Sequence, residues 1–309
     1  MPPTPPAYVG RFAPSPTGDL HFGSLIAAVA SFIDARAHGG RWLLRIEDVD
    51  RPRCVAGAAA GIQRSLERLG LLWDGEVLQQ SNRDANYRAA LDRLRGDGWV
   101  FACACSRKEI ADSQLQAGTE SVYPGTCRGG VAEGRVARAW RLAVGDAIVS
   151  FDDRLFGPQR QALARDCGDF VLLRADGLFA YQLAVVVDDA EQAVTDVVRG
   201  ADLLDSTARQ IFLMSCLGLT RPRYLHVPVA VDAGGRKLSK QFADRPLEAW
   251  PATDLLAAAL SFLQHPPPAD LRGAPSGEIL AWAIAHWQPL AIAPQRTRPA
   301  APFLAGAAA

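Results

Sequence analysis

Apolar residues recur at helical spacing in the stretch from residue 55 to residue 69. One face of the 3.6-residue period collects Val55, Ala58, Ala59, Ile62, Leu66 and Leu69. The opposite face carries the charged residues Arg64, Glu67 and Arg68. Gly70 follows at once, and glycine is common just after the last turn of a helix. The pattern therefore predicts an amphipathic helix that ends at Gly70.

Shorter apolar runs predict buried strands. They cover residues 8–13, 42–46 and 179–187, and the last is rich in β-branched residues and is followed by two aspartates. Helical patterns alternate with these runs, beginning with residues 25–37, and one more helix is expected at residues 278–287. Strands that alternate with helices indicate a parallel sheet in an α/β protein.

The segment from Arg11 to Ser24 connects the first predicted strand to the first helix. Ligands of parallel sheets collect at such carboxyl ends of strands. Two prolines and Gly18 restrict the loop to an extended, tight course, and Gly23 lets a ligand approach the backbone. Ser24 is expected to cap the helix, whose first amides then face an anion. His21 is a candidate phosphate donor, although loop histidines are often plain surface residues.

A second candidate phosphate-binding segment is residues 235–241. It contains Lys237 and Lys240, two of only three lysines in a chain with thirty arginines. A lysine ammonium is a compact charge on a flexible stem that can follow a phosphate, whereas the arginine fork suits carboxylates. We interpret the segment as a mobile phosphate clamp, and the plainer alternative is a solvated basic turn.

Four polar residues on otherwise apolar segments indicate the kind of substrate. Glu47 follows the strand at residues 42–46, where a carboxylate can hold an ammonium or can simply end the strand in solvent. Tyr181 lies inside an apolar run, as many core tyrosines do. Arg199 precedes a helix and can grip a carboxylate in a bidentate pair. Together with Arg11, these residues could bind a small amino acid that carries an extra acid group.

Three of the six cysteines are grouped. Cys103, Cys105 and Cys127 could supply three thiolates to a structural zinc site, which needs four ligands. No histidine lies between His38 and His226, so the fourth ligand would be an oxygen from Glu109, Asp112, Glu120 or water. Free buried cysteines are the alternative, and they are the interpretation we give to the scattered residues Cys54, Cys167 and Cys216.

The two phosphate-binding segments resemble the signatures of class I aminoacyl-tRNA synthetases of the glutamate and glutamine type. His21-Phe22-Gly23-Ser24 stands in place of His-x-Gly-His, and Lys237-Leu238-Ser239-Lys240-Gln241 in place of Lys-Met-Ser-Lys-Ser. Ser24 thus offers a hydroxyl where the family has a second histidine. Both variants in a short chain are similar to the compact glutamyl-queuosine tRNA(Asp) synthetases, and the resemblance covers about residues 8–265.

The resemblance implies a Rossmann-like parallel sheet with an inserted zinc-binding module and a short C-terminal helical region. The two halves of the catalytic domain would be residues 1–100 and 176–225, and the insert residues 101–175. Residues 226–309 would hold the signature loop, a helical region and a flexible tail, without an anticodon-binding domain.

The resemblance also implies a role for individual residues. The contacts to glutamate would be Arg11, Phe12, Ala13, Pro14, Ser15, Glu47, Tyr181 and Arg199. The contacts to ATP would be His21, Gly23, Ser24 and Lys240. The catalytic groups, acting with Mg²⁺, would be His21, Ser24, Lys237 and Lys240. One structural zinc would be held by Cys103, Cys105, Tyr123 and Cys127, because related proteins carry Cys-x-Cys followed by Tyr-x-x-x-Cys.

The implied reaction is the ATP-dependent activation of L-glutamate to glutamyl-adenylate without tRNA. Glutamate would then pass to the cyclopentenediol of queuosine at the anticodon wobble position of tRNA(Asp). One alternative is a truncated glutamyl-tRNA synthetase that charges a tRNA 3′ end, and another is a catalytically idle paralogue that binds tRNA. Without the resemblance, a small-molecule adenylyltransferase would also fit the phosphate loop.

Composition excludes several other classes of protein. The 33 basic and 33 acidic residues give a formal net charge of zero, which argues against nonspecific DNA binding through many phosphates. Any RNA contact is therefore expected to be local. No apolar run approaches the roughly 18 residues that span a bilayer, and the first six residues lack the features of a signal peptide. We expect a cytoplasmic monomer that makes no use of a membrane.

Overall fold

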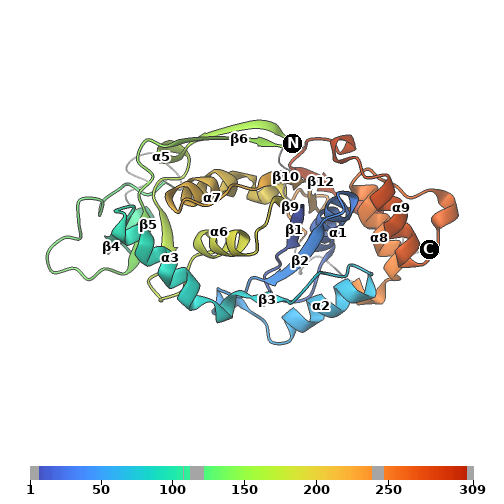
Figure 1. The fold of residues 1–309 in the computed structure, drawn as a ribbon, viewed down its shortest axis with the longest axis horizontal. Helices are drawn as coiled ribbons and strands as arrows, with labels where there is room; N and C mark the ends of the chain where they lie inside the picture. Colours follow the sequence, from blue (N-terminus) through green and yellow to red (C-terminus); the bar gives the residue numbers. More distant parts are fainter. Residues whose placement is uncertain (1–6, 107, 112–121, 239–246, 305–309) are drawn as a thin grey trace, which may run out of the picture.

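The computed structural model describes residues 7–106, 108–111, 122–238 and 247–304 of the 309-residue chain. Parallel strands form its centre (Figure 1). One sheet has the order β1-β2-β3, from β1 (Val9–Phe12), β2 (Arg41–Ile46) and β3 (Leu78–Gln79), and all its pairs are parallel. The parallel sheet expected from the alternating pattern is confirmed.

A second sheet continues this layer. Its order is β7-β6-β10-β9, with strands β6 (Ile148–Asp153), β7 (Gly157–Ala162), β9 (Asp196–Gly200) and β10 (Arg223–Val227). Strand β10 runs parallel to both β6 and β9, and β6 and β7 form an antiparallel hairpin. The backbone of Val9 in β1 bonds Thr195, next to β9, which joins the two sheets.

Two smaller sheets flank the parallel layer. The antiparallel sheet β4-β5-β8 is made by β4 (Val100–Cys103), β5 (Ala139–Leu142) and β8 (Phe170–Leu173). Strands β11 (Val229–Val231) and β12 (Thr297–Pro299) form a short parallel pair near the carboxyl end of the chain.

The helices form two hydrophobic cores with these sheets. One core packs α1 (Phe22–Ala37) and α2 (Ala58–Arg68) with α8 (Ala252–Phe262) and α9 (Ser276–Ala285). The other packs α3 (Asp84–Gly96) with α6 (Tyr181–Glu191) and α7 (Leu204–Cys216). Two short helices are α5 (Leu163–Asp166) and α10 (Ala301–Leu304), and the described residues 108–111 are also helical.

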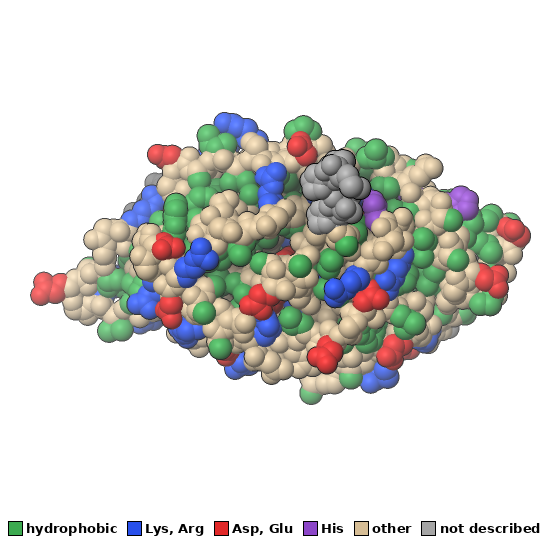
Figure 2. Space-filling model, in the orientation of Figure 1, with side chains coloured by type: hydrophobic (Ala, Val, Ile, Leu, Met, Phe, Trp, Pro, Cys, Tyr) green, Lys and Arg blue, Asp and Glu red, His purple; other side chains and the backbone are tan. Residues whose placement is uncertain are grey.

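The two cores lie toward opposite ends of an elongated molecule (Figure 1). Helices α8 and α9 occupy one end, whereas β4 and β5 lie at the other. On the face drawn in Figure 2, basic and acidic side chains are interspersed. None of the helices in the described ranges combines the length and the apolar character that a bilayer span requires.

Most of the predicted elements are confirmed. The strands at residues 8–13 and 42–46 are β1 and β2, and the helix at residues 278–287 is α9. The amphipathic helix is α2, which ends just before Gly70, whose φ of +76° closes it. Val55, however, precedes this helix and is 53% exposed, so it is not part of the apolar face.

The strand predicted at residues 179–187 is wrong, because this run begins the helix α6. Seven consecutive residues, 183–189, are buried in it. A helix buried on all sides has no polar stripe and cannot be told from a buried strand by periodicity. Packing against α7 and α3 decided its structure over the strand preference of its three valines.

Candidate active site

A cavity of about 620 Å³ opens where β1, β2 and β9 end. Its lining includes the loop between β1 and α1, together with Glu47, Tyr181, Arg199 and Lys237. The structure thereby brings together most of the residues expected to bind an amino acid and a nucleotide. The loop residues that line the cavity include Arg11, Phe12, Ala13, Pro14, Ser15, His21, Gly23 and Ser24.

His21, rather than Ser24, caps the first helix. The helix begins at Phe22, and the Nδ1 atom of His21 accepts a hydrogen bond of 3.3 Å from the backbone N–H of Ser24. The expected capping role of Ser24 is therefore wrong, since this residue already lies within the first turn. Its hydroxyl instead lies 2.9 Å from Nε2 of His21. The two residues form one polar unit at the N-terminus of the helix, where binding of an anion is favoured.

The two signature segments lie against each other at Gly23. A Cβ atom built on Gly23 would lie 3.2 Å from the His21 ring and 3.5 Å from the carbonyl oxygen of Leu238. Leu238 is in turn held by a backbone hydrogen bond to Ala230 in β11. A Cβ at position 23 would therefore crowd the His21 ring and would come into ordinary van der Waals contact with Leu238.

Lys237 lines the cavity and forms an ion pair with Asp202, which follows β9. Asp202 also lines the cavity, so the ion pair lies at its wall. Lys240 and Gln241, expected in the same signature segment, lie outside the described residues.

A buried network of charges supports the other end of the cavity. Asp189, near the end of α6, accepts from Nε of Arg11 at 3.2 Å and from Nη2 of Arg45 at 2.6 Å. Arg45 is fully buried in β2, and its Nη2 also lies 3.4 Å from a carboxylate oxygen of Glu47. The backbone N–H of Glu47 donates to the carbonyl of Pro14, which ties β2 to the loop. Arg45 and Asp189 therefore fix two of the expected glutamate contacts.

The carboxyl groups in this network differ in charge state. Burial raises the pKa of Glu47 to about 7, and the nearby Arg45 and Arg11 offset only part of that effect. Burial also acts to raise the pKa of Asp189, but Arg11 and Arg45 outweigh it and hold that pKa below its ordinary value. Asp189 is thus a firm counter-ion, whereas Glu47 titrates near neutrality.

Arg199 and Tyr181 come from the β9 strand and the first turn of α6. Arg199 is buried, and it donates from Nε to His226 at 3.0 Å and from Nη2 to Thr207 at 2.8 Å. Its Nη1 atom has no hydrogen-bond partner among the described residues. Burial raises the pKa of Tyr181, so this residue remains a neutral phenol at physiological pH. The arrangement offers a guanidinium nitrogen and a hydroxyl to a ligand.

Several residues that support the site were not singled out by the sequence, namely Arg45, Asp153, Asp189, Asp202, Thr207 and His226. Asp188-Asp189 was taken as the end of a strand, although two aspartates within a buried run require cationic partners. That requirement is the one signal in the sequence that could have pointed to Arg11 and Arg45.

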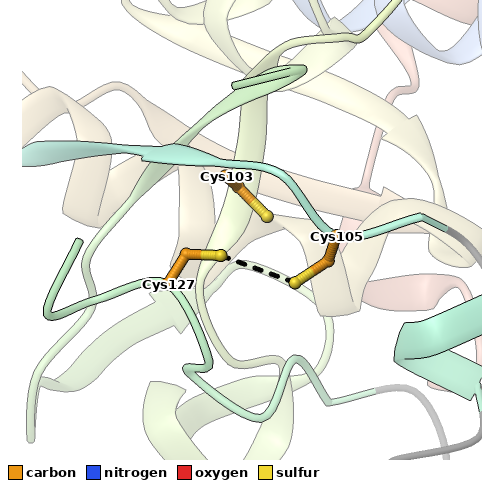
Figure 3. Close-up of side chains that lie close together, drawn as sticks. All are labelled: Cys103, Cys105 and Cys127. Atoms are coloured by element: carbon orange, nitrogen blue, oxygen red, sulfur yellow. Dashed lines mark hydrogen bonds between the residues drawn. The ribbon is translucent and has the colours of Figure 1, made fainter. Parts of the chain in front are cut away.

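The three grouped cysteines point toward one another beside the carboxyl end of β4 (Figure 3). Their Sγ atoms all lie within 4.8 Å of one another. The Tyr123 hydroxyl lies 3.4 Å from Sγ of Cys103 and 3.6 Å from Sγ of Cys105, and it accepts a hydrogen bond from the backbone of Cys127. Nε of Arg141 donates to Cys103 Sγ at 3.4 Å. This cluster could bind a metal ion.

The other oxygen ligands considered for this cluster are placed differently. The Glu109 carboxylate accepts from the backbone of Ser106 and from Arg135, so it is engaged in a surface ion pair. Asp112 and Glu120 lie outside the described residues. Among the described candidates, Tyr123 is the oxygen that lies against the cysteines.

Comparisons with known proteins agree with this geometry. Residues 8–249 match the family described as tRNA synthetases class I (E and Q), catalytic domain. A protein of Thiobacillus denitrificans named glutamyl-Q tRNA(Asp) synthetase is 56% identical over 283 residues, which cover 92% of this chain and 94% of that protein. One of the same name from Aromatoleum aromaticum is 57% identical over 91% of this chain and 89% of its own length. A glutamate-tRNA synthetase structure from Elizabethkingia anophelis superimposes with a TM-score of 0.80 at 22% identity, over 96% of this chain and 70% of that one, and shows the fold alone.

Proposed function

The chain belongs to the glutamyl-Q tRNA(Asp) synthetases, a family of class I tRNA synthetases, and on that premise we propose how its cavity serves their reaction. The first substrates are L-glutamate and ATP. The α-carboxylate of glutamate attacks the α-phosphorus of ATP, so that a carboxyl oxygen–phosphorus bond forms and pyrophosphate leaves. A hydroxyl of queuosine in tRNA(Asp) then attacks the carbonyl carbon of the glutamyl-adenylate, and AMP leaves.

The observation that carries this proposal is the union of two kinds of contact in one cavity. Arg199, with its unpartnered Nη1, suits a substrate carboxylate, and Glu47 suits an ammonium. His21, the first turn of α1 and Lys237 suit phosphate oxygens. A ligand that carries an amino acid and a phosphate chain, as an aminoacyl-adenylate does, would occupy both parts.

Positioning and charge neutralisation account for the chemistry, since no protein nucleophile is needed. The ammonium groups of Lys237 and Lys240 and the His21 and Ser24 donors would bind the triphosphate. Mg²⁺ bound with ATP would neutralise further phosphate charge. Lys237 is paired with Asp202 in this structure, so binding of ATP would require it to exchange one anion for another.

Cys103, Cys105, Cys127 and Tyr123 would hold one structural zinc ion. Three thiolates and one oxygen satisfy the four ligands that such sites use. The support is the short mutual spacing of the three sulfurs and the Tyr123 hydroxyl. Burial raises the pKa of Tyr123, so its phenolate would form only under the positive charge of a bound metal.

We also propose that the enzyme works in the cytoplasm, where its tRNA substrate is found, and as a monomer.

The first experiment is ATP–pyrophosphate exchange without tRNA, followed by transfer of labelled glutamate. We expect exchange that depends on glutamate and not on other amino acids, and transfer only to tRNA(Asp) that contains queuosine. Charging of tRNA that lacks queuosine would favour a truncated glutamyl-tRNA synthetase. Absence of exchange and of transfer would favour an idle paralogue, and exchange without any amino acid would favour another adenylyltransferase.

A further inference from the structure

A buried relay of side chains contacts Arg199 outside the cavity. It crosses three neighbouring parallel strands, from Asp153 at the end of β6, through His226 in β10, to Arg199 in β9. The Nδ1 atom of His226 lies 2.6 Å from Oδ2 of Asp153, and its Nε2 atom lies 3.0 Å from Nε of Arg199. Asp153 and His226 are buried, and neither lines the cavity.

The hydrogens of this relay can be assigned from its donors. Nε of Arg199 can only donate, so Nε2 of His226 must accept and the imidazole proton must sit on Nδ1, where it faces Asp153. The same Asp153 carboxylate accepts from the backbone N–H groups of Leu155 and Phe156, at 3.0 and 2.9 Å. Burial, with the Arg199 charge beside it, lowers the pKa of His226 to about 4, although Asp153 acts in the opposite sense. His226 is therefore neutral in the pH range in which the enzyme would work.

Each bond of the relay restricts the Arg199 guanidinium. Nε is fixed by His226, and Nη2 is fixed by the Thr207 hydroxyl and by the carbonyl of Leu203. Nη1 is buried and is the nitrogen that has no partner among the described residues. Because these three partners are neutral, they orient the guanidinium without cancelling its charge.

We propose that His226 and Asp153 are positioning residues for substrate recognition, holding Arg199 so that Nη1 meets a carboxylate of glutamate. The inference rests on the proposed function, in which Arg199 binds glutamate. Loosening the relay should therefore weaken the binding of glutamate and not that of ATP.

Two substitutions at His226 separate positioning from packing. In His226→Gln the side-chain oxygen reproduces the Nε2 acceptor for Arg199, whereas in His226→Asn the side-chain amide reproduces the Nδ1 donor to Asp153 and the acceptor is lost. We expect the KM for glutamate in pyrophosphate exchange to rise about tenfold in His226→Asn, because a charged buried donor loses its acceptor. His226→Gln should stay within about threefold of the wild type, and the KM for ATP should be unchanged in both.

Thr207 offers a second pair if the His226 variants fail to fold. Thr207→Val removes the nearer of the two acceptors of Nη2 at nearly constant shape and should also raise the KM for glutamate, whereas Thr207→Ser keeps the hydroxyl and should not. Equal effects of the two His226 variants and of the two Thr207 variants would overturn the proposal. So would a parallel rise in the KM values for glutamate and ATP.

A measurement without substrate distinguishes failure of the relay from failure of the proposed function. Nitrogen NMR of the imidazole, assigned by its loss in His226→Gln, should show the proton on Nδ1 at pH 7. A proton on Nε2 would overturn the relay whatever the activity. Wild-type exchange that does not depend on glutamate would refute the proposed function, and the NMR result would still decide whether the relay exists.

Discussion

Replacing Glu47 by glutamine should make the protein more stable at alkaline pH while weakening its binding of glutamate. Glu47 is 7% exposed, and burial raises its pKa from the ordinary 4.5 to about 7. A raised pKa means that the folded state disfavours the ionised carboxylate. The proposed role in binding an ammonium requires that same ionised form, so stability and function oppose each other at this residue.

The magnitude follows from the linkage between proton binding and folding. Between pH 4.5 and about 7 the folded protein holds the Glu47 proton more tightly than the unfolded chain does, so the free energy of unfolding falls as the pH rises through this window. At about 1.4 kcal/mol per pKa unit, the full effect above pH 7 is about 3 kcal/mol. Glutamine does not titrate. Because part of the loss has already occurred at pH 5, Glu47→Gln should gain about 2.5 kcal/mol over the wild type between pH 5 and pH 8.

The assay is urea unfolding of both proteins at several pH values from 5 to 8.5. Other titrating groups are common to both chains, so the difference between the two curves isolates Glu47. A difference that does not change with pH would refute the raised pKa and the reasoning built on it. In the exchange assay, the KM of the wild type for glutamate should rise as the pH falls below about 7. Glu47→Gln should have a high KM at every pH, since it lacks the charge.

Four further substitutions test other parts of the molecule. Lys240→Ala should lower ATP–pyrophosphate exchange by at least about a hundredfold with an unchanged thermal unfolding curve, and near-normal exchange would exclude its role. Cys127→Ser should lose the zinc measured by elemental analysis, whereas Tyr123→Phe, which keeps three thiolates, should bind it more weakly; equal zinc content in all three proteins would argue against the site. Leu66→Ala in the core under α2 should lower the free energy of unfolding by about 3 kcal/mol, and a cost near zero would mean that this face is not packed as described.

The elements that could be predicted from sequence are those whose hydrophobic pattern distinguishes a buried face from an exposed one. Helix α2 is such a case, because its charged side faces solvent and Gly70 marks its end. Helix α6 is the opposite case, because its own buried residues, which are apolar apart from two paired aspartates, cover all of its sides. The identity of α6 depends on α3, α7 and the arginines of β1 and β2, which lie far away in the sequence.

The candidate site divides in the same way. Many of the residues that line the cavity were named by the resemblance to a known family, whereas Asp202, which also lines it, was not. His226 and Asp153 lie in no motif, since a histidine and an aspartate at strand ends are common in any α/β protein. Their link to Arg199 exists only through the register of β9 on β10, in which Arg199 pairs with His226. Such register is set by the packing of the whole sheet and cannot be inferred from either strand alone.

The compensation of charge around the cavity supports the proposal that an amino acid binds there. Of the two buried arginines in the lining, Arg11 has a direct carboxylate partner in Asp189, whereas the hydrogen bonds of Arg199 go to neutral groups. The carboxylate nearest to it along the relay, Asp153, is separated from it by the His226 ring. Glu47 is a carboxyl group whose negative charge is only partly balanced, since the 3.4 Å contact with Arg45 does not restore its ordinary pKa. Tyr181 senses both charges, because Arg199 lowers its pKa and Glu47 raises it, and the cavity therefore presents one cation and one anion whose missing partners a carboxylate and an ammonium would supply.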